Sequence, residues 1–71
     1  MELRRFNNKV VRITDIDGQI FEGVTLYEDK DVHDEELDVL SVNSGTRWTK
    51  LFEDEIKEIE ITEKINQSKS P

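Results

Sequence analysis

The fold depends most on the ten residues from Thr14 to Gly23, TDIDGQIFEG. Two aspartates around one residue, followed by glycine, are typical of the start of a calcium-binding loop. Such a loop needs glycine at its sixth position and a chelating glutamate at its twelfth. Counted from Asp15, these positions hold Ile20 and Leu26, whose side chains offer no oxygen ligand. We therefore interpret the stretch as a β-hairpin whose turn, Asp17-Gly18, adopts the type I′ conformation with positive φ.

Apolar and β-branched residues on both sides of this turn indicate two paired strands. In the segment from Lys9 to Ile16, Val11 and Ile13 share one face, as in a half-buried strand. A second strand is predicted from Gln19 to about Tyr27. Gly23 lies inside it, where a residue without a side chain is typical of a bulge or a sharp bend. The pattern predicts a hairpin that bends strongly.

The flanking sequence predicts three more strands and two short helical turns. A charged loop, Glu28 to Glu36, follows the hairpin, and Glu53-Asp54-Glu55 is long enough for one helical turn. Near the start, Leu3 and Phe6 have helical spacing, and Asn7-Asn8 can end a short N-terminal helix. The later strands are predicted from Leu37 to Val42, from Thr46 to Phe52 and from Ile56 to Thr62.

In this order of elements, the chain resembles the Sm and Sm-like family of small β-barrels from about Leu3 to Ile61. The most specific part is VRITDIDGQIFEGVTLYED, which is similar to the first conserved block of the family, with an aromatic residue at Phe21, glycine at Gly23 and aspartate at Asp29. The resemblance implies a mainly β fold, a five-stranded, strongly bent antiparallel barrel of SH3-like or Sm-like type with a short N-terminal helix. The C-terminal domain of the ribosome maturation factor has a similar strand-turn-strand pattern.

The sequence departs from that family at the positions that contact RNA. His33 stands where the family has an asparagine that contacts a base. Phe52 and Glu53 stand in the second family block, where a basic residue and a glycine are expected. A basic residue suits phosphate binding and a glycine suits a tight backbone, whereas Phe52 and Glu53 suit neither role. The resemblance therefore covers the fold and not the RNA-contact motifs.

Charge opposes binding of nucleic acid by the whole surface, because the chain of 71 residues has a formal net charge of −7. The first 14 residues are an exception, with a balance of +3. If single-stranded RNA is the ligand, we expect phosphate contacts from this basic segment and a base contact from His33. The alternative is that these are solvated side chains on a helix and a strand. The basic residues are Arg4, Arg5, Lys9 and Arg12.

Catalysis and metal binding find little support in the sequence. Cysteine is absent and there is one histidine, so no histidine-based triad or thiolate metal site can be assembled. The segment Asp29 to Asp34 contains three aspartates and His33, but gathering them around a metal would cost chain entropy in a charged loop. We expect a noncatalytic protein without a cofactor or a metal.

A binding module that forms homo-oligomers is the predicted function. Members of the Sm and Sm-like family pair the fourth strand of one subunit with the fifth strand of the next. Strand edges supply the backbone hydrogen bonds for such pairing. Trp48 and Phe52 are interpreted as core or interface residues rather than base-stacking residues. The rival prediction is a protein-interaction or scaffold module, monomeric or dimeric, whose acidic faces reject nucleic acid. The interface residues are predicted to be Trp48, Phe52, Ile59 and Ile61.

The chain is predicted to form one domain, residues 1–62, followed by a flexible tail, residues 63–71. A membrane span needs about 20 apolar residues, and no apolar run in the sequence approaches this length. The start of the sequence lacks the apolar segment of a secretory signal. We therefore expect a cytoplasmic protein without a membrane partner.

Overall fold

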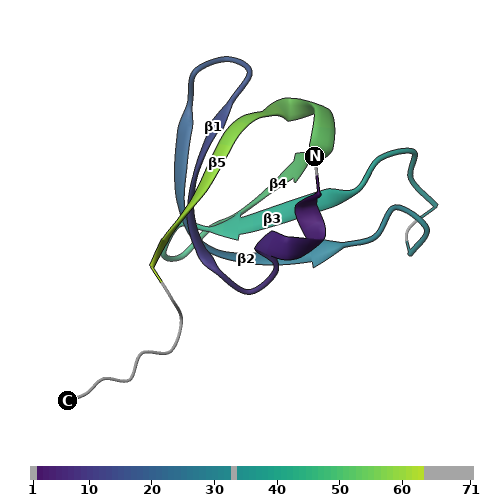
Figure 1. The fold of residues 1–71 in the computed structure, drawn as a ribbon, viewed down its shortest axis with the longest axis horizontal. Helices are drawn as coiled ribbons and strands as arrows, with labels where there is room; N and C mark the ends of the chain where they lie inside the picture. Colours follow the sequence, from purple (N-terminus) through teal and green to yellow (C-terminus); the bar gives the residue numbers. More distant parts are fainter. Residues whose placement is uncertain (1, 33, 64–71) are drawn as a thin grey trace.

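A computed structural model describes residues 2–32 and 34–63, which form one antiparallel sheet of five strands in the order β4-β3-β2-β1-β5 (Figure 1). The prediction of a mainly β fold with five antiparallel strands is confirmed. Both helical turns are present as 3-10 turns. The elements are η1 (Leu3–Phe6), β1 (Val10–Asp15), β2 (Ile20–Glu28), β3 (Val39–Asn43), β4 (Trp48–Phe52), η2 (Glu53–Glu55) and β5 (Ile56–Glu63).

Strand β2 bends at the predicted glycine. Its first half pairs with β1 and its second half pairs with β3, with Val24 paired on both sides. Gly23 has a φ of 154°, and a Cβ atom at this position would lie 1.7 Å from the backbone oxygen of Asn43. Only glycine allows β2 and β3 to approach this closely. The sheet curls along β2 (Figure 1), in agreement with the bend that the sequence predicts at Gly23.

The turn between β1 and β2 differs from the predicted type I′ turn. Asp17 keeps a negative φ, and the turn residue with a positive φ is Gly18, at 87°. The Gly18 N–H group donates to the Asp15 carbonyl at 3.0 Å, and the Asp15 N–H group donates to the Gln19 carbonyl at 2.9 Å. This pattern is a three-residue turn that ends in a left-handed glycine.

The physical reason for this turn is the carboxylate of Asp15, a residue that is 7% exposed. Its Oδ1 atom accepts the N–H groups of Asp17 at 2.9 Å and Gln19 at 2.8 Å. An aspartate that binds the backbone in this way favours a turn other than the two-residue hairpin. The carboxylate that suggested a calcium ligand is therefore engaged with the backbone.

Replacing Asp15 with alanine is expected to lower the free energy of unfolding by about 1–3 kcal/mol, because two turn N–H groups lose their acceptor. Urea denaturation followed by circular dichroism measures this loss. Asp17→Ala is the control, since the Asp17 side chain is exposed and we expect its removal to change stability by less than about 0.5 kcal/mol. Equal losses for the two variants would contradict this role of Asp15.

The core lies on one face of the sheet, where Val11 and Ile13 are fully buried as their alternation predicts. β3 contributes Leu40 and Val42 to the same cluster. The other buried members of the cluster are Leu3, Leu51 and Ile56, and Phe6, Phe21, Tyr27 and Ile59 pack against it.

Thr25 attaches the N-terminal turn to β2. Its side chain is fully buried, and its hydroxyl group donates to the Phe6 carbonyl and accepts the Lys9 N–H group at 3.1 Å. The backbone of the same residue bonds to Asn8 and Lys9, each at 3.0 Å. Asn8 has a φ of 56°, the left-handed geometry predicted for the residues that end η1. Because Leu3 is buried in the core, η1 is fixed against one end of the sheet.

Several predicted boundaries shift by one or two residues. The third strand begins at Val39 rather than Leu37, because the preceding Asp38 carboxylate accepts the Lys30 N–H group of the loop. The fourth begins at Trp48 rather than Thr46, which lies in the preceding turn. The predicted tail, except for its first residue, lies outside the described residues.

In the part of the chain that the structure describes, β4 and β5 are the two edges of the sheet and do not pair with each other. The sheet is therefore open, and closure into an SH3-like or Sm-like barrel stays a prediction.

Candidate functional site

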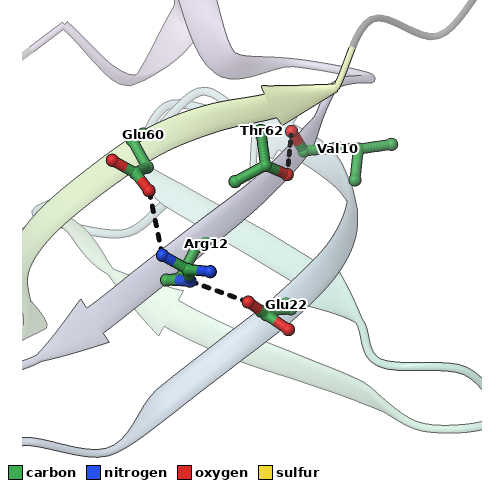
Figure 2. Close-up of polar contacts among 5 residues, drawn as sticks. All are labelled: Val10, Arg12, Glu22, Glu60 and Thr62. Atoms are coloured by element: carbon green, nitrogen blue, oxygen red, sulfur yellow. Dashed lines mark hydrogen bonds and ion pairs between the residues drawn. The ribbon is translucent and has the colours of Figure 1, made fainter.

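Arg12 lies at the centre of the outer face of β1, opposite to the face that carries Val11 and Ile13. Its Nε atom donates to Glu22 on β2 at 2.7 Å, and its Nη1 atom donates to Glu60 on β5 at 3.1 Å (Figure 2). The hydrogen bond and charge of Glu22, followed by the charge of Glu60, raise the pKa of Arg12. One cation therefore links three adjacent strands.

A groove of about 650 Å³ opens on this outer face. Cross-strand pairing places two rows of side chains here, because directly paired residues point to the same side of a sheet. Arg12 pairs with Glu22 and Glu60 in one row, and Thr14 pairs with Ile20 and Glu58 in the other. The residues that line the groove are Arg12, Thr14, Ile20, Lys57, Glu58, Ile59 and Glu60.

The groove has both polar and apolar parts. Ile20 is 61% exposed and supplies an aliphatic surface at the groove. Lys57 occupies the bulge where the pairing of β5 with β1 shifts between Glu58 and Ile56. The sequence pattern does not predict this groove. The alternation of β1 signals an outward Arg12, but its carboxylate partners depend on strand pairing over 10 and 48 residues.

The structure does not gather the predicted phosphate contacts into one site. Arg4 lies 3.6 Å from the Asp29 carboxylate and 5.7 Å from the centre of the Tyr27 ring, beyond the half of β2 that contacts Arg12. Arg5 lies beside its neighbour Phe6 on η1. Lys9 is half-buried and its backbone is bonded to β2.

Arg4 and Arg12 are both ion-paired with carboxylates, which reduces the positive field available to phosphate. His33, the predicted base contact, lies outside the described residues.

A polar cluster at the end of β2 fixes the loop before β3. The Tyr27 hydroxyl group donates to Asp38 Oδ2 at 3.0 Å, and the Lys30 N–H group donates to Asp38 Oδ1 at 2.9 Å. The bond from Lys30 lowers the pKa of Asp38, and the bond from Tyr27 acts in the same direction. Burial, followed by the bond to Asp38, raises the pKa of Tyr27. At neutral pH the Asp38 carboxylate therefore stays charged and the Tyr27 hydroxyl group stays protonated. Both hydrogen bonds persist, and the cluster fixes the loop.

Two residues of β4 direct their backbone N–H and C=O groups toward the edge of the described sheet. Bonded and non-bonded residue pairs alternate along an antiparallel ladder. The Ser44 N–H group donates to the Arg47 carbonyl at 3.0 Å, which sets this alternation between β3 and β4. The N–H and C=O groups of Trp48 and Lys50 therefore point away from β3, toward the open edge.

The same argument places the edge-facing groups of β5. The bond from Asp15 to Gln19 directs the backbone of Ile13 toward β2, and Ile13 pairs with Ile59 across the other side. The N–H and C=O groups of Ile59 and Ile61 consequently face the free edge. Ile61 is also 41% exposed at its side chain.

The sequence pattern offers two places for Trp48, the core and an interface. The first is wrong, because Trp48 is 49% exposed. Leu51, 5% exposed, supplies the inward residue of β4 instead, since the strand presents its other face to the core. Phe52 is half-buried on the outer side, with the Lys50 ammonium group 5.3 Å from its ring centre. The interface predictions for Trp48, Phe52, Ile59 and Ile61 stay predictions.

Within residues 2–32 and 34–63, no three histidine, cysteine, aspartate or glutamate side chains are placed to hold a metal ion. Asp29 of the predicted loop constellation is paired with Arg4 and also accepts the Asp31 N–H group at 2.8 Å. No helix in the described part of the chain is long and apolar enough to cross a membrane.

The described residues form a small, open, mainly β domain with an outer groove of mixed charge and two strand edges that no described strand pairs. Comparisons of the chain with protein-family models, with curated proteins and with solved structures find no match.

Proposed function

We propose that the protein is a noncatalytic binding module with an Sm-like barrel arrangement that self-associates through the edges of β4 and β5. The observation that carries this proposal is the pair of unpaired edges in the described sheet. Trp48 and Lys50 present backbone groups on one edge, and Ile59 and Ile61 present them on the other. Unpaired strand edges bind other strands through their N–H and C=O groups.

The sheet order determines the kind of assembly that the edges support. β4 and β5 lie at opposite ends of the sheet, so β4 of one copy meets β5 of the next copy. Such a head-to-tail contact builds a ring where the rotation between copies closes, and a filament where it does not. The exposed side chains of Trp48 and Ile61 add apolar burial to the backbone bonds. The Sm-like resemblance implies the ring.

Protein is the favoured class of partner. The net charge of −7 repels phosphate groups, and Arg4 and Arg12 are already paired with carboxylates. This argument favours the protein-interaction alternative over RNA association, and it is compatible with self-association.

Lys50→Pro is expected to convert the assembled protein into monomers. Proline removes the N–H group that faces the free edge of β4, and an edge strand tolerates proline at such a position. Sedimentation velocity at tens of micromolar measures the assembly, and circular dichroism checks the fold. Lys50→Ala is the matched control, which removes the same charge, keeps the N–H group and should remain assembled. A strictly monomeric natural chain, or assembly that survives the proline variant, would contradict the proposal.

A further inference from the structure

We propose that the groove over β1, β2 and β5 binds an extended segment of a partner protein in which a lysine or arginine lies next to an aliphatic residue. The site uses the outer face of the sheet, so it is separate from the self-association of the strand edges. It assigns the chemistry of a partner that the proposed function leaves open.

Charge is the first argument for a basic partner. Two cations, Arg12 and Lys57, face three carboxylates, those of Glu22, Glu58 and Glu60. Arg12 is bonded to two of the carboxylates, whereas Glu58 makes no ion pair with any described residue. A lysine or arginine side chain from a partner would complete the pairing of Glu58. The net charge of −7 attracts the same partner over longer distances.

Geometry is the second argument. Glu22 and Glu60 each use their Oε2 atom to bind Arg12, and the other oxygen of each carboxylate is available to a second donor. Arg12 holds the two carboxylates in place from opposite sides, as Figure 2 shows. A carboxylate that is already held in place loses less side-chain entropy when a cation binds to its other oxygen. Arg12 is therefore a positioning residue in this groove.

The apolar part of the groove is the third argument. Ile20 is 61% exposed on this face, whereas Ile59, which also borders the groove, packs its side chain against the core. Burial of Ile20 beneath an aliphatic side chain of the partner gives a favourable term that salt does not screen. The combination of a carboxylate row and one exposed aliphatic residue selects a mixed basic and aliphatic segment over a purely basic one.

The test uses the full chain and a fluorescein-labelled peptide of eight residues in which lysine and valine alternate. Fluorescence anisotropy measures binding at low and moderate salt. Parallel titrations use the same peptide with glutamate for lysine, the same peptide with glycine for valine, and an eight-nucleotide poly-U RNA. We expect the lysine–valine peptide to bind most tightly and the glutamate peptide and the RNA not to bind.

Two variants test the site, and both change exposed side chains that the fold does not need. Glu58→Gln is expected to weaken binding about three-fold, the effect of one exposed ion pair. Ile20→Ser is expected to weaken it about five-fold through lost apolar burial. Glu36→Gln is the matched control, since it removes the same charge from the loop before β3 and should leave affinity unchanged.

Three results would overturn the site. These are equal losses in Glu58→Gln and Glu36→Gln, tighter binding of the glutamate peptide or the RNA than of the lysine–valine peptide, or no peptide binding at low salt. Lys50→Pro separates this site from the proposed self-association. If only self-association fails, the natural chain is monomeric and still binds the peptide, as the Lys50→Pro variant does. If only the groove fails, assembly persists without peptide binding.

Discussion

Gly23→Ala is expected to remove most of the stability of this domain, roughly 3–5 kcal/mol. The positive φ of 154° strains any side chain, and a Cβ atom would lie 1.7 Å from the Asn43 backbone oxygen. Backbone atoms in paired strands cannot move aside without breaking the pairing of β2 with β3. A domain of this size has about 4–10 kcal/mol of total stability, so the variant is expected to be largely unfolded near body temperature.

Gly45→Ala provides the control for this effect. Gly45 also has a positive φ, 112°, but a Cβ atom there meets nothing within 4 Å. We expect a loss of about 1–2 kcal/mol from backbone strain alone. Thermal unfolding and urea denaturation compare the two variants. If both lose the same stability, the close approach of β2 to β3 does not make Gly23 necessary.

Leu40→Ala has the second largest expected effect, a loss of about 2–5 kcal/mol in the free energy of unfolding. Leu40 is fully buried on β3 between its paired residues, Tyr27 on β2 and Leu51 on β4. Truncation leaves a cavity in the middle of a small core. The other core side chains belong to paired strands, which limits how far they can move to fill it.

Leu26→Ala is the matched control for Leu40→Ala. Leu26 lies on β2 beside β3, but its side chain is on the outer face and is 49% exposed. The same change in chemistry is therefore expected to cost less than about 1 kcal/mol. Denaturant unfolding of both variants tests which face of the sheet forms the core. A larger loss for Leu26→Ala would mean that the faces are assigned incorrectly.

The two proposed binding surfaces, the outer groove and the strand edges, depend on different interactions. Edge pairing depends on backbone groups and tolerates changes of side chain. The groove depends on side chains, namely the carboxylates around Arg12 and the exposed Ile20. Salt weakens the ionic part of groove binding and leaves the backbone bonds of the edges largely unaffected. Titrations at two salt concentrations therefore help to tell the two modes apart.

The polar anchors of the fold were not predictable from the sequence. The sequence around Asp15 is typical of a metal ligand, whereas in the fold its carboxylate accepts the turn N–H groups and so gives a turn other than type I′. Asp38 appeared as one residue of a strand, but it binds Tyr27 and Lys30 and so fixes the loop. An aspartate side chain suits a turn, a metal or a cation equally well in a sequence, and only the position of donors decides among them.

The sequence by itself determined the strands, the position of the hairpin and the bend at Gly23. These features follow from local properties, namely the alternation of apolar residues along a strand and the backbone conformations that glycine alone permits. The tertiary structure decided which face of β4 is buried, so that Leu51 rather than Trp48 enters the core. It also decided that Arg12 is held between Glu22 and Glu60. The reason is register: a shift of one residue in strand pairing turns every side chain to the other face, and the register depends on contacts between residues far apart in the chain.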